Sequence, residues 1–131
     1  MSAREELEKH AGELLENTGI KAEIVEEQNR IFVILTKVPL PAGCANVACT
    51  DVLFITDTQY PLSAMDMFYT EVEVVRANGT PFENSESIEE YCGRKWRRFS
   101  YHRNAPWKPG GNPLLDHFAL METRWTAKAK R

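Results

Sequence analysis

The chain has 131 residues, of which 43% are hydrophobic and 27% are charged, with only 7 glycines and 7 prolines. This balance is typical of one soluble globular domain over residues 1–131, and it excludes collagen-like, disordered and disulfide-stapled miniature proteins. The formal net charge of −3 argues against bulk electrostatic attraction to nucleic acid, although it allows a local basic patch.

Targeting signals and membrane spans are not expected. The longest apolar run covers residues 31–35, whereas a membrane-spanning helix needs about 20 apolar residues. The first ten residues are charged and acidic, unlike a secretory signal, so we expect a cytoplasmic protein. An odd number of cysteines, at Cys44, Cys49 and Cys92, argues for reduced thiols.

An amphipathic helix is predicted at the start of the chain. Ser2 and Glu5 have the spacing of a capping box, in which each side chain binds the backbone N–H of the other. Apolar residues then recur at helical spacing until Gly19, at Leu7, Ala11, Leu14 and Leu15.

Four β-rich runs follow, at residues 21–26, 31–38, 51–56 and 65–75. The first two are separated by the polar residues 27–30 and resemble a hairpin, and Pro39 stops the second. In the fourth run the side chains alternate between two faces. Short connections between successive strands predict a four-stranded antiparallel meander.

The remainder is predicted to be an irregular segment and a closing helix. Residues 80–90 are polar, residues 94–102 are basic and aromatic, and residues 106–111 are rich in proline and glycine. Asn112 and Pro113 suit the cap and first turn of a helix, and residues 126–131 suit a frayed basic tail. The helical stripe comprises Leu114, Leu115, Phe118, Met121, Glu122 and Trp125. The fold class is therefore α+β.

This order of elements resembles the ubiquitin-conjugating enzymes. Tyr60-Pro61 before the fourth strand and Trp107-Lys108-Pro109 before the last helix are similar to the Tyr-Pro and Trp-x-Pro motifs of that superfamily. The pattern Trp96-x-x-Phe99-Ser100-x-His102, followed by Trp107-x-Pro109-Gly110, resembles the bacterial ubiquitin-conjugating-like family E.

The resemblance implies a UBC-like fold and a carrier role. Such a carrier would receive the C-terminus of a ubiquitin-like protein from an activating enzyme and pass it on, without a cofactor. Members of the family occur beside ubiquitin-like proteins, an activating enzyme and a metallopeptidase, which are therefore the expected partners.

Two departures concern the nucleophile. The superfamily's His-Pro-Asn tripeptide is missing, and no cysteine stands about eight residues before Trp107, where the family has its acceptor. Ser100 lies seven residues before Trp107, and Cys92 lies fifteen before it. The resemblance thus implies an oxyester on Ser100 or, as the alternative, a thioester on Cys92, whose pKa the nearby Arg94 and Lys95 would lower.

A serine hydroxyl must be activated by its neighbours. If residues 98–102 are extended, Arg98 and His102 flank Ser100 on one face, although same-face neighbours are about 7 Å apart. His117 on the closing helix is an alternative base, and Asn104 or backbone amides of the 106–111 loop are candidate oxyanion donors.

Other interpretations remain open. The chain would be a catalytically inactive module of the same fold if it only binds a ubiquitin-like protein or an activating enzyme. The basic and aromatic residues between Arg94 and Arg103 would suit single-stranded nucleic acid. Cys44 and Cys49 with Cys92 or His102 would make a loosely spaced zinc site. No phosphate-binding loop is present in the sequence, which argues against nucleotide hydrolysis.

Overall fold

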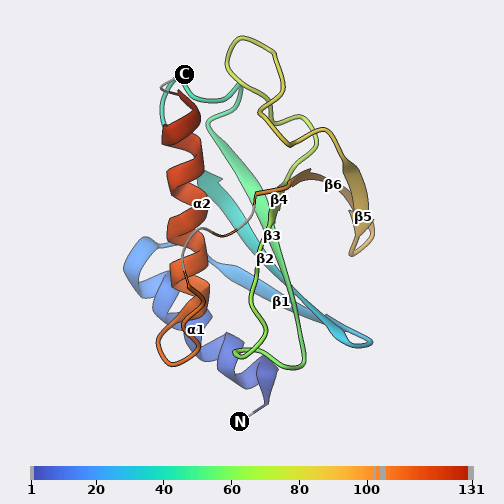
Figure 1. The fold of residues 1–131 in the computed structure, drawn as a ribbon, viewed down its shortest axis with the longest axis vertical. Helices are drawn as coiled ribbons and strands as arrows, with labels where there is room; N and C mark the ends of the chain where they lie inside the picture. Colours follow the sequence, from blue (N-terminus) through green and yellow to red (C-terminus); the bar gives the residue numbers. More distant parts are fainter. Residues whose placement is uncertain (1, 102, 104–105, 130–131) are drawn as a thin grey trace.

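A computed structural model describes residues 2–101, 103 and 106–129, and for residues 126–129 it describes the backbone alone. The described residues form two helices and one sheet, and Figure 1 shows the helices beside the twisted sheet. The elements are α1 (Ala3–Thr18), β1 (Ala22–Glu27), β2 (Arg30–Pro39), β3 (Cys49–Asp57), β4 (Phe68–Thr70), β5 (Ile88–Tyr91), β6 (Arg94–Phe99) and α2 (Pro113–Ala129).

The first helix forms as its sequence predicts. The Ser2 hydroxyl accepts a hydrogen bond from the Glu5 backbone N–H at 3.1 Å, and the Ser2 N–H donates to the Glu5 carboxylate at 2.9 Å. The helix ends at Gly19, whose φ of 77° is in the left-handed region and whose N–H donates to the Leu15 carbonyl at 2.8 Å. Both ends are therefore satisfied by local bonds.

The sheet is antiparallel throughout, in the order β1-β2-β3-β4-β6-β5. The meander predicted for the first four strands is confirmed, but the sheet has six strands because the basic segment forms β6 and pairs with β5. Cys92 and Gly93 join these two strands with φ of 55° and 75°. Two left-handed residues make a turn whose twist matches a hairpin, and a Cys-Gly pair is a weak signal for it.

The prediction of one long strand over residues 65–75 is wrong. Only Phe68–Thr70 pairs with its neighbours. Beyond it the chain turns, with the Val74 N–H donating to the Glu71 carbonyl at 3.2 Å. The side chain of Asn46 then binds the Val75 N–H and the Glu73 carbonyl. A side chain from a loop therefore takes the backbone bonds that a neighbouring strand would have taken.

The last helix begins at the predicted cap, where the Asn112 side-chain oxygen accepts from the Leu115 N–H at 3.0 Å. It continues to Ala129, so the prediction of a frayed tail from residue 126 is wrong as far as residue 129. Alanine and lysine are favourable helix formers, and the sequence Thr-Ala-Lys-Ala holds no residue that would stop a helix. Within the described residues, neither helix combines the length and apolarity needed to cross a bilayer.

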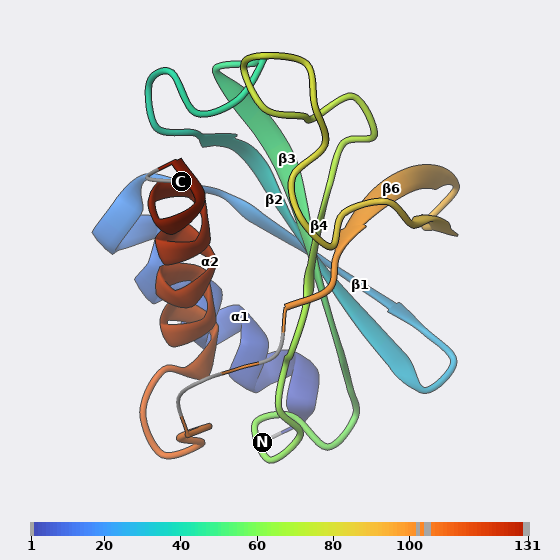
Figure 2. The same ribbon diagram turned by 45° about the horizontal axis from the view of Figure 1, so that its top comes forward.

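Both helices cover the same face of the sheet, as Figure 2 shows. The main core lies between them and the sheet, and it includes Leu7, Leu14, Phe54, Phe99, Leu114, Phe118 and Trp125. The opposite face has no helix over it within the described part of the chain, and it carries a smaller cluster formed by Phe32, Ile34, Leu53, Tyr69 and Trp96. Ser100 follows β6 on this second face.

Candidate functional site

Ser100 lies at the point where β6 leaves the sheet. The last pair of the β4–β6 ladder joins Phe68 to Phe99, so Ser100 stands one position further, beside Met67. Its N–H donates to the Asn84 carbonyl at 2.9 Å, which fixes the backbone. The side chain is half-buried. The hydroxyl is thus held in place without being enclosed.

A guanidinium group contacts the Ser100 hydroxyl directly. The Nε of Arg98 donates to Ser100 Oγ at 2.8 Å, and its Nη1 donates to the Glu89 carboxylate at 2.7 Å. An arginine can only donate, so the serine oxygen is the acceptor and its own proton points elsewhere. The positive charge beside this oxygen favours the alkoxide over the hydroxyl. The predicted position of Arg98 beside Ser100 is confirmed.

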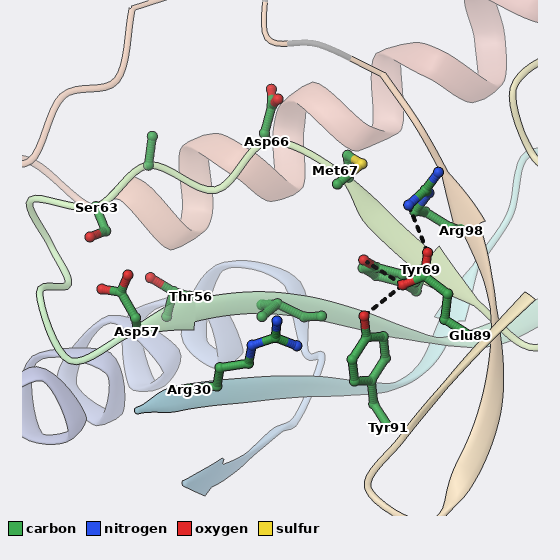
Figure 3. Close-up of a pocket in the computed structure, with 12 residues that line it drawn as sticks. Arg30, Thr56, Asp57, Ser63, Asp66, Met67, Tyr69, Glu89, Tyr91 and Arg98 are labelled. Atoms are coloured by element: carbon green, nitrogen blue, oxygen red, sulfur yellow. Dashed lines mark hydrogen bonds and ion pairs between the residues drawn. The ribbon is translucent and has the colours of Figure 1, made fainter. Parts of the chain in front are cut away.

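Two tyrosines hold the carboxylate that orients Arg98. The hydroxyl of Tyr91 donates to Glu89 Oε1 at 2.6 Å, and the hydroxyl of Tyr69 lies 3.5 Å from the same oxygen. Burial, followed by the neighbouring Tyr91 and Glu89, raises the pKa of Tyr69, so its hydroxyl keeps its proton. These contacts, which Figure 3 draws, make a connected polar network on the open face of the sheet.

A cavity of about 430 Å³ opens beside this network. Arg98, Glu89, Tyr69 and Tyr91 line one end, as Figure 3 shows, and Thr56, Asp57 and Ser63 gather at the other. Met67, the neighbour of Ser100, also lines the cavity. This volume is within the range of small-ligand and peptide sites. A half-buried serine therefore stands at the margin of a space that can hold part of a partner.

His117 packs under the segment that follows Ser100, but both of its ring nitrogens are occupied. Nε2 lies 3.0 Å from the Met67 carbonyl, which only accepts, and Nδ1 lies 2.9 Å from Arg103 Nη1, which only donates. The proton is thus assigned to Nε2. Burial and the nearby Arg103 lower the pKa of His117 to about 4, against the opposing effect of the Met67 bond. This geometry suits a packing role, with neither nitrogen directed at Ser100.

Cys92 lies at the opposite end of β6, in the hairpin turn. Eight positions of extended chain span up to about 25 Å, so Cys92 and Ser100 belong to different sites. Burial, with contributions from Glu27 and Glu23, raises the pKa of the Cys92 thiol. The expectation of a lowered pKa is wrong, because the opposing effect of Arg94 is smaller than these.

The motif residues that carry the resemblance contact one another. The indole N–H of Trp107 donates to the Pro61 carbonyl at 2.6 Å, and the Tyr60–Pro61 bond is cis. The hydroxyl of Tyr60 lies 2.7 Å from Nδ1 of the buried His10. The Trp107 bond ties the loop between β3 and β4 to the segment after Ser100, and the Tyr60 contact ties the same loop to α1. His102 and Asn104, the other two candidate site residues, lie outside the described residues.

The basic run between Arg94 and Arg103 is largely engaged in internal contacts. Arg94 pairs with Asp51 at 3.1 Å, and Arg97 donates to two backbone carbonyls, those of Val72 and Ser85. Arg98 is bound as described above, and Arg103 contacts the Met65 carbonyl and His117. Only the exposed Lys95 has no such contact in the described part of the chain. The patch proposed for nucleic acid therefore has little free charge.

The zinc interpretation gains no support from the described residues, where no three potential ligands cluster. Cys44 is buried, Cys49 is exposed and Cys92 is intermediate, and all three are free thiols.

Glu89 and Tyr91 were missed by the sequence analysis, which placed them in an irregular stretch. Recognising a hairpin at residues 88–99 would have placed them beside the basic strand, because cross-strand neighbours of opposite charge on one face stabilise a sheet. The register pairs Glu89 with Trp96, and the Arg98 side chain reaches Glu89 diagonally. The missed signal was therefore the turn at Cys92, without which no partner for Arg98 could be assigned.

Comparison with known proteins identifies the family. The family model of prokaryotic E2 family E matches residues 7–128, which is almost the whole chain. The chain belongs to prokaryotic E2 family E. This confirms the resemblance seen in Trp96, Ser100 and Trp107, and membership indicates a ubiquitin-conjugating-like role. Neither a curated protein nor a solved structure matches the chain.

Proposed function

We propose that this family E protein is an acyl carrier that holds the C-terminus of a ubiquitin-like protein as an oxyester on Ser100. Family membership supports the class of reaction. The observation that carries the choice of residue is the 2.8 Å hydrogen bond from Arg98 Nε to Ser100 Oγ. Cysteine carriers need no such partner, whereas a serine requires a group that favours its ionised form.

The proposed reaction has two steps. Ser100 Oγ attacks the activated carbonyl carbon of the tail, a C–O ester bond forms, the bond between that carbon and its leaving group on the activating enzyme breaks, and the leaving group takes the serine proton. An amine then attacks the same carbon, a C–N bond forms, the C–Oγ bond breaks, and Ser100 Oγ takes the proton that the amine loses. Arg98 stabilises the negative charge on Oγ in both steps and is itself unchanged by the reaction.

Ser100 is a better candidate than Cys92 for three reasons. It lies seven residues before Trp107, its neighbours Arg98 and Met67 line a cavity, and the Arg98 guanidinium stabilises its ionised form. The Cys92 thiol instead has a raised pKa and sits in the hairpin turn beside carboxylates. A thioester on Cys92 and a catalytically inactive binding module are the two alternatives that the test must separate.

Intact-mass spectrometry tests the proposal. The protein is mixed with its cognate activating enzyme, the ubiquitin-like protein and ATP, as wild type, Ser100→Ala and Cys92→Ala. We expect an adduct with wild type and Cys92→Ala that is absent from Ser100→Ala. An adduct lost only in Cys92→Ala would establish the thioester. Absence of an adduct in all three, with measurable binding of the ubiquitin-like protein, would show a binding module instead.

A further inference from the structure

The cavity beside Ser100 is a break in the sheet. β3 and β4 pair at only two positions, Val52 with Thr70 and Leu53 with Tyr69. Residues 55–57 of β3 and residues 63–67, which precede β4, then separate and line opposite sides of the cavity. Figure 3 shows the two segments on either side of it. Among the described residues, no backbone hydrogen bond joins them.

The edge of β3 presents its backbone groups to this break. The N–H of Asp51 donates at 3.2 Å to the carboxylate of Glu71, just beyond the end of β4. Backbone groups alternate in direction along an antiparallel strand, so those of Leu53 and Ile55 point toward the same side. Leu53 meets β4, whereas Ile55 has no strand opposite it. The sheet therefore has a short free edge inside the cavity.

A buried hydroxyl without a hydrogen-bond partner lies beside the cavity. Thr56 lines the cavity and is 94% buried, since its relative exposure is 6%, yet its hydroxyl has no hydrogen-bond partner among the described residues. A buried hydroxyl without a partner costs stability and is uncommon in folded proteins. The oxygen itself is closed off from solvent, so a bound group would give it a partner only after the side chain turns toward the cavity.

We infer that an extended peptide segment, the C-terminal tail of the ubiquitin-like protein, occupies this break as an added strand along β3. The inference rests on the proposed function, which places the end of that tail on Ser100. A free strand edge selects an extended backbone, whose donors and acceptors alternate in the same way. The lining also mixes cations and carboxylates, including Arg30 and Asp57, so side-chain charge alone does not define the occupant.

The geometry fixes the direction of the tail. Ser100 stands beside Met67, at the end of the cavity where β3 and β4 still pair. The tail would run from the Asp57 end toward Ser100, opposite to β3, which leads toward Asp57. This is antiparallel addition. At about 3.4 Å per residue, the three residues nearest the ester would lie along the break.

Peptide binding tests the inference without catalysis. The Ser100→Ala protein is titrated with a synthetic peptide of the last eight residues of the cognate ubiquitin-like protein, and backbone amide shifts are followed by NMR. We expect shifts at residues 55–57 and 63–67 and slower amide exchange at Ile55. The same peptide with N-methylated backbone amides is the control, and it should bind at least tenfold more weakly. Shifts confined to other surfaces, no shifts, or equal binding of both peptides would overturn the inference.

A filling variant tests the same site during transfer. Ser63 points into the cavity in Figure 3, whereas its neighbour Leu62 is 72% exposed and does not line it. Ser63→Trp should raise the KM for the ubiquitin-like protein at least tenfold with little change in kcat, and Leu62→Trp should leave KM within twofold. A wild-type KM for Ser63→Trp with a Ser100-dependent adduct would refute the tail site alone. An adduct that persists in Ser100→Ala would refute the proposed function.

Discussion

His117 makes the stability of the protein depend on pH in a defined window. Burial and Arg103 lower the pKa of this imidazole to about 4 in the folded state, whereas an exposed histidine has a pKa of about 6.5. Between these values the unfolded chain binds a proton that the folded chain does not, so unfolding is favoured as the pH falls. The stabilisation is present above pH 6.5 and is lost toward pH 4.

The magnitude follows from the two pKa values. Each pKa unit corresponds to about 1.4 kcal/mol, which gives a loss of about 3 kcal/mol between pH 7 and pH 4. His117→Gln is the matched variant. The glutamine amide can donate from its NH2 group to the Met67 carbonyl and accept from Arg103 at its oxygen, but it takes no proton. His10, whose pKa burial also lowers, is present in both proteins and cancels in the comparison.

Urea unfolding of wild type and His117→Gln at several pH values provides the measurement. We expect the free energy of unfolding of wild type to fall about 3 kcal/mol further than that of the variant between pH 7 and pH 4. Parallel curves for the two proteins would show that His117 titrates normally. That result would refute the buried, neutral imidazole, and with it the argument that His117 is unsuited to serve as the base for Ser100.

Three further predictions concern the site, the core and the first helix. Arg98→Ala should slow adduct formation by about 10- to 100-fold at neutral pH and move the pH–rate profile to higher pH, because a donor to Ser100 Oγ is lost. Arg94→Ala, which loses ion pairs with Asp51 and Glu71 and a contact with the Trp96 ring but no contact with Ser100, is the control, and equal effects of both would contradict the role of Arg98. Phe99→Ala should lower the free energy of unfolding by about 3–5 kcal/mol, because Phe99 is 1% exposed and stacks on Phe68 at 4.9 Å; a loss below about 1 kcal/mol in urea unfolding would show a loosely packed core. Ser2→Ala should cost about 1 kcal/mol through loss of the helix cap, and a change near zero would mean that the capping box contributes little.

The parts of the fold that were predicted are those with local signals. The capping box at Ser2 and the cap at Asn112 each depend on residues within a few positions, and both helices begin where these residues predict. The first three strands follow from β-rich runs, of which the first two are separated by a polar turn. Local sequence is sufficient where the hydrogen bonds that define an element are local.

The two errors in the predicted strands arise where hydrophobic periodicity carries no signal. β5 and β6 form because Cys92 adopts a left-handed φ of 55°, which its sequence does not favour. The strand at residues 65–75 is short because Asn46, from a distant loop, binds its backbone. The first depends on a turn conformation that its residue types do not favour, and the second on a contact between residues far apart in sequence, so hydrophobic periodicity reveals neither.

The part of the site that depends on local sequence was predicted, and the part that depends on the tertiary fold was missed. Ser100 and Arg98 are two residues apart, so their contact follows from an extended strand. Glu89 was missed because its contact with Arg98 depends on the hairpin, and the low pKa of His117 was missed because burial is a property of the whole fold.

The most direct test of the central claim exchanges the oxygen of residue 100 for sulfur. Wild type and Ser100→Cys are charged with the ubiquitin-like protein, and each adduct is treated with a thiol reductant and with alkaline hydroxylamine. The account predicts that the wild-type adduct survives the reductant and yields to hydroxylamine, as an oxyester does, whereas the Ser100→Cys adduct is released by the reductant. A wild-type adduct that the reductant releases, or one whose stability is unchanged in Ser100→Cys, would contradict an oxyester on Ser100.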